Sequence, residues 1–285
     1  MASAVRQYDV VRVEPQGVAS VADRVASEAP LEVRLHGEPF AVIMRTPGFE
    51  RDLTAGFLLS ESIVTRPDDI AGIEVGSHTD MVNVTLAGDR ASALPDILGT
   101  RRQVAMNSSC GMCGRRTLAS LDVTRAPLAL DWRVPAAVIA SLPAALGAAQ
   151  PIFADTGGLH AAALFHRDGR LEASAEDVGR HNAVDKLVGR MLLADRLPLA
   201  GMLLFVSGRS SFEIVQKAVL AAIPMIAAVS APSSLAIDLA GEAGITLVGF
   251  LRDGRFNIYA HAARVDIGST DRSAPGAADV VPSRA

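Results

Sequence analysis

The second half of the chain alternates between short apolar runs and longer segments with helical periodicity. Short apolar runs bounded by turn residues are typical of buried strands, and apolar spacings of three and four residues are typical of helices. We expect strands at 160–166, 202–207, 224–230 and 245–251, and helices at 134–149, 180–194, 211–222 and 233–243. Strands interleaved with helices predict an α/β sheet that has helices on both faces and gathers ligands at its strand ends.

The N-terminal part has a different pattern, richer in strands. Alternating residues predict strands within 31–44, around a His-Gly-Glu-Pro turn, and at 81–89, with a core-packing helix at 49–63 between them. The fold class is therefore α/β (α+β), with a small β-rich domain before the α/β domain. The predicted organisation is a flexible N-terminus at 1–17, a β-rich domain at 18–105, a connecting segment at 106–131, an α/β domain at 132–267 and a disordered tail at 268–285.

Composition argues against two classes of protein. A net charge of -4 and a pI near 5.9 do not suit a protein that coats nucleic acid, although a local basic pocket is compatible with them. The most apolar stretches, 197–206 and 218–231, are too short or interrupted by Pro224 to span a membrane. The N-terminus has no apolar stretch typical of a secretory signal. We therefore expect a cytoplasmic protein that binds neither nucleic acid nor membranes.

The chain has two cysteines, Cys110 and Cys113, separated by two residues. In a reducing cytosol such a pair is more often reactive or metal-binding than a structural disulfide. Glycines after each cysteine leave the backbone free to turn sharply and expose both sulfurs. Arg115 and Arg116 follow at once, and nearby positive charge favours the reactive thiolate form. The segment is therefore predicted to be a reactive loop.

Three other interpretations of this pair are open. A zinc site normally needs four ligands, so it would have to recruit histidines such as His160 or His181. A thioredoxin-like dithiol would begin a helix that follows a strand, whereas the flanking Asn-Ser-Ser and Gly-Arg-Arg are typical of a loop. Two buried, inert thiols are disfavoured by the polar, glycine-rich surroundings. A sulfur-carrying or redox role agrees best with the sequence.

Four polar segments fall at the expected strand ends, at 155–160, 176–182, 207–211 and 252–255. Each combines glycine with a residue able to hold an anion, and amides at glycine turns and helix starts suit phosphate groups. Because guanidinium is planar and stays charged, four arginines are the natural phosphate partners: Arg180, Arg209, Arg252 and Arg255. Together the segments predict a pocket of nucleotide size.

Two of these segments also have a purely structural interpretation. Ser210 or Ser211 could simply cap the helix at 211–222. Segment 176–182 could be a solvated turn before a helix that has Asp185 and Lys186 on its exposed face. The chain has neither a Walker-type Gly-Lys-Ser/Thr cradle nor a G-x-G-x-x-G turn between strand and helix, which argues against ATP hydrolysis and nicotinamide chemistry.

Several long motifs occur in an order found in one known family: RTPGFERDLTAGFLLSES, SSCGMCG, TGGLHAAAL, EDVGRHNAVDK, SGRSSFEIVQKA and LVGFLRDGRFNIYAH. Over about residues 31–265 the chain resembles the formate dehydrogenase accessory sulfurtransferase family, FdhD. One departure is Ala175, where the family commonly has a basic residue, so one phosphate contact is in doubt.

The resemblance implies a cytoplasmic sulfur carrier and sulfurtransferase. Such a protein takes sulfur from a cysteine desulfurase as a cysteine persulfide and transfers it to the molybdenum bis(guanine dinucleotide) cofactor, which then enters formate dehydrogenase. The family's cysteine motif falls on Cys110, expected to carry the persulfide, and Cys113, expected to assist. The resemblance also implies a homodimer, a cytidine deaminase-like C-terminal domain, and a site that GDP-like nucleotides can occupy.

The cofactor is expected to contact the end of the strand at 245–251 and two neighbouring segments. The residues predicted to bind it are Phe250, Leu251, Arg252, Asp253, Gly254, Arg255, Arg180, His181, Ser207, Gly208 and Arg209. No metal ligands are expected, and deaminase chemistry is not implied because His160 is followed by Ala-Ala and Cys110 is preceded by Ser. A non-catalytic molybdenum cofactor-binding chaperone and a thiol-disulfide oxidoreductase are the alternative functions.

Overall fold

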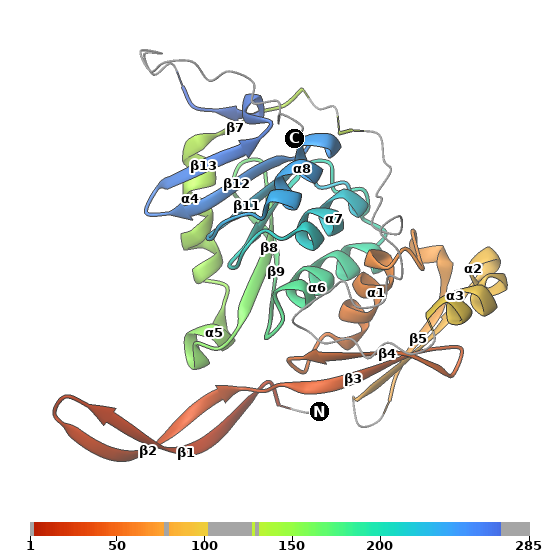
Figure 1. Ribbon diagram of the computed structural model, residues 1–285, viewed down its shortest axis with the longest axis horizontal. Coiled ribbons are helices and arrows are strands. Elements are labelled where there is room, and N and C mark those ends of the chain that lie inside the picture. The colour runs from red at the N-terminus through yellow and green to blue at the C-terminus, as the bar shows by residue number, and fades with distance from the viewer. Residues whose placement is uncertain (1–2, 77–79, 102–126, 129–130, 269–285) are drawn as a thin grey trace.

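Six strands form the central sheet of the computed structural model, which describes residues 3–76, 80–101, 127–128 and 131–268 (Figure 1). The order across the sheet is β13-β12-β11-β10-β8-β9. β10, β11 and β12 are parallel, whereas β8 and β13 run antiparallel to their neighbours. The strands are β8 (His160–His166), β9 (Leu171–Asp177), β10 (Met202–Val206), β11 (Met225–Ala228), β12 (Thr246–Arg252) and β13 (Arg255–Ala260).

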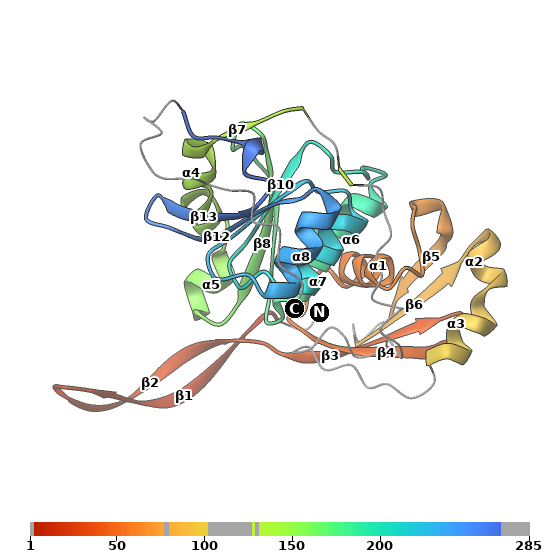
Figure 2. The same cartoon turned by 45° about the horizontal axis from the view of Figure 1, so that its top comes forward.

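Helices cover both faces of this sheet. One face packs against α6 (Arg180–Leu193), α7 (Phe212–Leu220) and α8 (Ser234–Ala243), and the other against α4 (Ala136–Gly147) (Figures 1 and 2). Successive strand residues divide between two apolar cores, so that Leu204 and Leu247 face the first layer while Leu203 and Val248 face the second. The predicted mixed α/β class is confirmed; the cytidine deaminase-like description stays a prediction.

A smaller four-stranded sheet with the order β4-β3-β6-β5 lies beside the central one. Its first hairpin turns at His36 and Gly37, both with positive φ, as the His-Gly-Glu-Pro motif predicts. Its elements are β3 (Ala29–Leu35), β4 (Glu38–Arg45), α1 (Glu50–Ser60), η1 (Pro67–Asp69), β5 (Ile70–Val75), β6 (Met81–Leu86), α2 (Gly88–Ser92) and α3 (Leu94–Arg101). The remaining short elements are β7 (Val134–Pro135), α5 (Pro151–Thr156), η3 (Ala262–Arg264) and β14 (Val265–Asp266).

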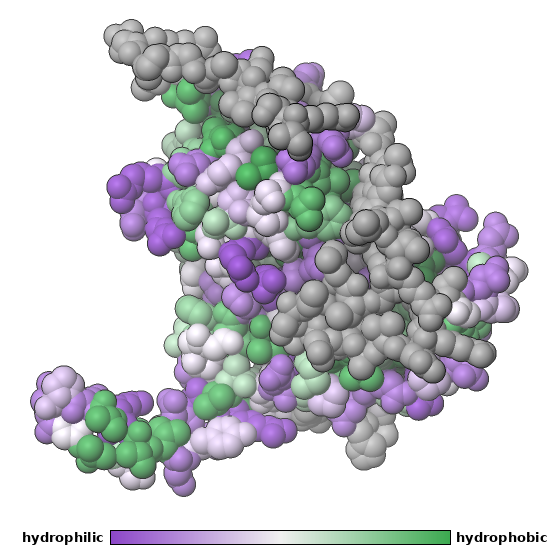
Figure 3. Space-filling model, viewed as in Figure 1, coloured by the Kyte–Doolittle hydropathy of each residue, from purple (hydrophilic) through white to green (hydrophobic). Residues whose placement is uncertain are grey.

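The chain at 1–17, predicted to be a flexible N-terminus, contains a regular strand. Strand β1 (Val5–Glu14) pairs antiparallel with β2 (Gly17–Ala26), and this ribbon projects from the body of the molecule (Figures 1 and 3). Its valines stay exposed, Val11 by 69% and Val13 by 75%, so no buried face imposes a regular polar–apolar alternation on the sequence. Backbone pairing defines these strands, and composition alone does not reveal it.

The predicted domain boundaries stay a prediction. The apolar core of the smaller sheet is continuous with that of the α6–α8 layer, because α1 packs against α6. Residues 102–126, 129–130 and 269–285 lie outside the described residues, and they include most of the predicted connecting segment and most of the predicted tail. Within the described ranges, none of the helices has both the length and the apolar character needed to cross a bilayer.

Two glycines allow α1 and α6 to approach at backbone contact. A Cβ atom at Gly56 would lie 1.9 Å from the carbonyl oxygen of Asp185, and one at Gly189 would lie 1.9 Å from that of Asp52. These distances leave no room for any side chain. The glycines therefore decide how the N-terminal sheet joins the helix that leads into the central sheet.

We expect Gly56→Ala to lower the free energy of unfolding by about 1–3 kcal/mol or more, because the added methyl group forces the two helices apart. Urea denaturation measures the change. The matched control is Gly241→Ala on the exposed side of α8, where a Cβ meets nothing within 4 Å in the described part of the chain. That control should be neutral or stabilising by up to about 1 kcal/mol. Equal stability of Gly56→Ala and wild type would contradict this account of the helix contact.

Candidate functional site at one edge of the sheet

Strand direction brings the predicted site residues to one edge of the central sheet. β9, β10, β11 and β12 all end at this edge, and β8, which runs the opposite way, begins there. Arg180 and His181 follow β9, residues 207–209 follow β10, and residues 250–255 form the end of β12 and its turn. The four polar segments thus lie at the same edge of the sheet, as the α/β pattern predicts. Their role in binding stays a prediction.

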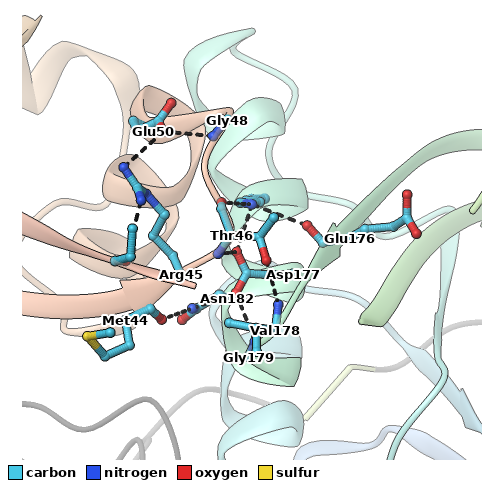
Figure 4. A network of polar contacts seen from close by, with 12 residues as sticks. Met44, Arg45, Thr46, Gly48, Glu50, Glu176, Asp177, Val178, Gly179 and Asn182 are labelled. Atoms are coloured by element: carbon cyan, nitrogen blue, oxygen red, sulfur yellow. Dashed lines mark hydrogen bonds and ion pairs between the residues drawn. The ribbon is translucent and has the colours of Figure 1, made fainter. Parts of the chain in front are cut away.

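A buried polar network holds the start of α6 in place (Figure 4). The ammonium group of Lys186 lies 2.7 Å from the carboxylate of Asp177, and both side chains are essentially inaccessible. Asp177 also accepts hydrogen bonds from the backbone N–H of Thr46 (3.1 Å) and of Gly179 (2.8 Å) and from the side-chain amide of Asn182 (2.8 Å). The network therefore fastens the chain after β4 to the turn that precedes Arg180.

The interpretation that places Asp185 and Lys186 on an exposed face of α6 is wrong. Both side chains are buried, because α1 covers that face. Lys217 on α7 lies 2.6 Å from Asp185, and the hydroxyl of Ser60 donates to the same carboxylate at 2.7 Å. Lys186 also donates to the carbonyl of Thr46 at 3.0 Å. Asp185 and Lys186 each have an opposite charge and a further hydrogen-bond partner, which burial of a charge in an apolar core requires.

Arg180 and His181 occupy the first turn of α6. The Nε2 atom of His181 lies 2.8 Å from the carboxylate of Glu213 and 3.1 Å from the hydroxyl of Ser211, so it ties α6 to the start of α7. Within the described ranges, the buried Nδ1 of His181 and Nε of Arg180 have no hydrogen-bond partner. Unpaired buried polar atoms are costly, and their concentration at one point is typical of a ligand site.

The first turn of α7 lacks the expected cap. Ser211 is the N-cap residue, but its side chain makes no capping bond to the helix and contacts His181 instead. The buried hydroxyl of Ser210 has no partner among the residues that the structure describes. The interpretation of these serines as simple caps is therefore wrong. The N-cap residue of helix α6, Gly179, likewise provides no side-chain cap, so two neighbouring helices present N-terminal amides that favour an anion.

Gly208 permits a close contact between this cluster and the start of β8. A Cβ atom at Gly208 would lie 3.5 Å from Nδ1 of His160 and 3.6 Å from Cδ of Arg180. The hydroxyl of Ser207 accepts a hydrogen bond from the backbone N–H of Ala161 at 2.9 Å, which holds the end of β10 against β8. Arg209 is exposed beside them. The predicted residues 207–209 therefore lie next to Arg180 and His181.

His160, the last residue of the polar segment at 155–160, belongs to the same cluster. Burial lowers the pKa of His160 from its ordinary value of 6.5, and the positive charges of Arg180 and His181 lower it further against the opposing effect of Asp177. The imidazole therefore tends to remain neutral beside the guanidinium. An anion bound at this point would reverse part of that effect by favouring the protonated ring.

The end of β12 forms a second part of the site. Asp253 and Gly254, with φ of 51° and 72°, make the two-residue turn into β13. Arg252 and Arg255 line an open hollow of about 610 Å³ beside the turn. Leu251, expected to contact the ligand, is instead fully buried in the core beneath this hollow. Its side chain contributes packing.

The two cysteines lie outside the described residues, so the position of Cys110 and Cys113 relative to this edge stays a prediction. Among the residues that are described, no three His, Cys, Asp or Glu side chains are arranged to hold a metal ion. His160 and His181, considered as zinc ligands, are neighbours of Arg180.

Sequence reasoning missed the residues that support the site. Asp177, Asn182 and Lys186 were seen only as part of a polar turn and helix, because their partners at 44–46 are far away in the sequence. The available signal was that Asp185 and Lys186 stand between the apolar residues Val184 and Leu187 in a helix that is covered on two sides. It is ambiguous without knowledge of what covers the helix.

A family model described as the FdhD/NarQ family matches residues 26–266. The chain belongs to this family. Among FdhD relatives, the sulfur carrier protein FdhD of Streptomyces avermitilis is 50% identical over 268 residues, covering 90% of this chain and 94% of the relative. The sulfur carrier protein FdhD of Sulfurisphaera tokodaii is 45% identical over 264 residues, covering 92% and 99%. The resemblance predicted from the motifs is confirmed.

A solved structure agrees with the FdhD/NarQ assignment. The crystal structure of a protein from Desulfotalea psychrophila, assigned as a formate dehydrogenase accessory protein, matches with a TM-score of 0.74 and 25% sequence identity. The match covers 92% of this chain and 100% of that one. The similarity therefore extends over both sheets of the FdhD/NarQ fold.

We expect Asp177→Asn to lower the free energy of unfolding by about 3–5 kcal/mol, because it leaves the ammonium of Lys186 buried without a counter-charge. Chemical denaturation near neutral pH measures the loss. The control is Asp23→Asn, which breaks the half-exposed pair with Arg12 at 3.8 Å and should cost about 1 kcal/mol or less. Similar losses for the two variants would contradict the importance of the buried pair.

We expect the stability to decrease as the pH falls below 6.5 because of His160. Its pKa is lowered in the folded state, so below 6.5 the unfolded chain binds a proton that the folded chain resists. His160→Gln should flatten this part of the stability profile between pH 8 and pH 5. An unaltered slope in His160→Gln would refute the assignment.

Proposed function

We propose that this protein is a cytoplasmic sulfur carrier and sulfurtransferase that delivers sulfur to the molybdenum bis(guanine dinucleotide) cofactor of formate dehydrogenase. Family membership supports this proposal, since relatives 45–50% identical over nine-tenths of the chain are named sulfur carrier protein FdhD. The observation that carries the cofactor part is the cluster of unpartnered polar atoms at two uncapped helix starts, beside Arg180. Such a cluster suits the phosphates of a nucleotide-bearing ligand.

The sulfur enters as a persulfide on Cys110. A cysteine desulfurase offers a persulfide whose terminal sulfur is attacked by the Cys110 thiolate, so the donor leaves as a thiolate and the new S–S bond forms on this chain. The number of electrons is unchanged in this step. Cys113 is close in sequence and provides the second thiol that the following step needs.

Sulfur leaves as sulfide, which requires two electrons. The Cys113 thiolate attacks the Cys110 sulfur, forms a Cys110–Cys113 disulfide and releases the terminal sulfur as hydrosulfide. The hydrosulfide replaces an oxygen ligand of the cofactor, and that oxygen leaves as water. Two cellular thiols then reduce the disulfide and leave as a disulfide themselves. Cys113 therefore supplies, within this chain, the thiolate that releases the terminal sulfur as hydrosulfide.

The sheet edge holds the nucleotide arms of the cofactor in this proposal. Arg180, His181 and the amides of α6 and α7 bind phosphate, Gly208 and Arg209 border them, and Arg252 and Arg255 extend the cationic surface. GDP-like guanine nucleotides serve as mimics of those arms. The protein works as a homodimer that receives sulfur from the desulfurase and passes the sulfurated cofactor to formate dehydrogenase.

Mass spectrometry after incubation with a desulfurase and free cysteine tests the carrier function. Wild type should gain the mass of one sulfur atom on a peptide that contains Cys110 and Cys113, and Cys110→Ser should not. Cys113→Ser should retain the added sulfur but fail to release it, because the second electron donor is gone.

The opposite outcomes identify the alternatives. If wild type gains no sulfur but Cys110→Ser still supports formate dehydrogenase maturation, the protein is a non-catalytic cofactor chaperone. If a disulfide cycles with thiol substrates and no sulfur is added, it is a thiol-disulfide oxidoreductase.

A further inference from the structure

The two ring nitrogens of His181 have very different surroundings. Nε2 lies 2.8 Å from the carboxylate of Glu213 and 3.1 Å from the hydroxyl of Ser211, both at the start of α7. Nδ1 is buried and has no hydrogen-bond partner among the described residues. Because only 6% of the side chain is exposed, bulk water does not compensate Nδ1 either. One nitrogen of the ring is therefore engaged by the protein, and the other is left for a ligand.

The contacts of His181 differ from those of a nucleophilic triad. In such a triad the hydroxyl and the carboxylate contact opposite nitrogens of the histidine, which takes the hydroxyl proton while the carboxylate orients the ring. Here Ser211 and Glu213 both contact Nε2. They therefore orient the ring without activating Ser211, and Nδ1 is the atom available for binding.

The contact with Glu213 decides which nitrogen carries the proton of the neutral ring. A carboxylate only accepts hydrogen bonds, so Nε2 donates, and Nδ1 of the neutral ring is then a lone pair. A lone pair repels a phosphate oxygen, whereas a protonated Nδ1 donates a charge-assisted hydrogen bond to it. A phosphate group therefore gains a favourable contact with Nδ1 only when the ring binds a second proton.

Other groups beside His181 suit an anion at this position. The Nε atom of Arg180 and the hydroxyl of Ser210 are also buried without partners in the part of the chain that the structure describes. Helices α6 and α7 begin here without side-chain caps. Groups from several elements contribute charge at this corner: Arg180 on α6, Glu213 on α7, His160 on β8, Asp177 at the end of β9 and Arg209 after β10. Glu213 directly contacts the ring and so compensates the charge that a second proton adds.

We propose that His181 takes up a proton when a phosphate group binds at the starts of α6 and α7, and that Glu213 is the positioning residue for this step. The inference rests on the proposed function, because it concerns how the nucleotide phosphates of the cofactor are held. The proton comes from solvent and binds to Nδ1, which donates to a phosphate oxygen while Nε2 donates to Glu213. No other bond forms or breaks. Release of the cofactor returns the proton to solvent.

Calorimetric titration of the full chain with GDP measures this proton. Titrations at about pH 8, where an ordinary imidazole is neutral, are compared in Tris and in Hepes, whose ionisation enthalpies differ. Wild type should take up about one proton per GDP bound, and its GDP affinity should fall as the pH rises, by up to about tenfold per pH unit. A purely structural role of His181 predicts a binding heat that does not depend on the buffer.

Substitutions in two His–Glu pairs test the role of Glu213. Glu213→Gln keeps the shape and a hydrogen-bond acceptor at Nε2 but removes the charge. It should abolish most of the proton uptake and weaken GDP binding by roughly 10- to 100-fold. The matched control is Glu172→Gln, because Glu172 lies 2.6 Å from Nε2 of His166, which ends β8 at the opposite edge of the sheet. That control should alter neither the uptake nor the affinity.

His181→Gln and His160→Gln assign the proton to one ring. Uptake should disappear in His181→Gln and persist in His160→Gln. Uptake that persists in His181→Gln, or that is lost in His160→Gln, overturns the inference, and so does equal uptake in Glu213→Gln and wild type.

Two outcomes in wild type alone are also decisive. GDP binding without proton uptake overturns the inference and leaves the proposed function intact. A chain that takes up desulfurase sulfur but does not bind GDP disproves both the inference and the nucleotide part of the proposed function, and leaves the sulfur carrier standing.

Discussion

The buried ion pair between Asp177 and Lys186 is the interaction on which the site depends. Neither charge is accessible to water, so each relies on the other and on hydrogen bonds from the chain around Thr46. Desolvation of such a pair is expensive, and its net contribution to stability is smaller than its attraction suggests. The ion pair fixes the local geometry, because only one arrangement gives each of these polar groups its hydrogen-bond partner. That arrangement aims the first turn of α6, and with it Arg180 and His181, at the edge of the sheet.

The N-terminal sheet is therefore a structural support for the site. Gly56 and Gly189 let α1 lie directly on α6, and Asp185 is satisfied between Ser60 on α1 and Lys217 on α7. Apolar packing continues from the smaller sheet into the helix layer without a break. Because interiors are close-packed, a shift in one helix would be transmitted to the start of the next.

The site itself has the opposite character. Among the described residues, Arg180 Nε, His181 Nδ1 and Ser210 Oγ are buried without hydrogen-bond partners, and the two helices that begin beside them have no side-chain cap. Each such atom destabilises the protein alone, and a bound anion would satisfy several together. Phe250 is a further example, since its exposed side chain and its positive φ do not stabilise the isolated fold. In a stable fold, local departures of this kind are expected at functional positions.

Sequence alone determined the interior strands of the central sheet, because burial on both faces leaves continuous apolar runs, and it determined the four long helices around the sheet. It also determined the family, because the motifs are long. It also predicted that the polar segments meet at one edge, which follows from strand direction. Tertiary structure decided the rest. The edge strands β9 and β13 and the β1–β2 ribbon have no complete buried face, so their sequences carry little periodicity. The bulge at Phe250 and the burial of Lys186 depend on partners distant in the chain, and a residue's own neighbours contain no information about which charge or strand will pack against it.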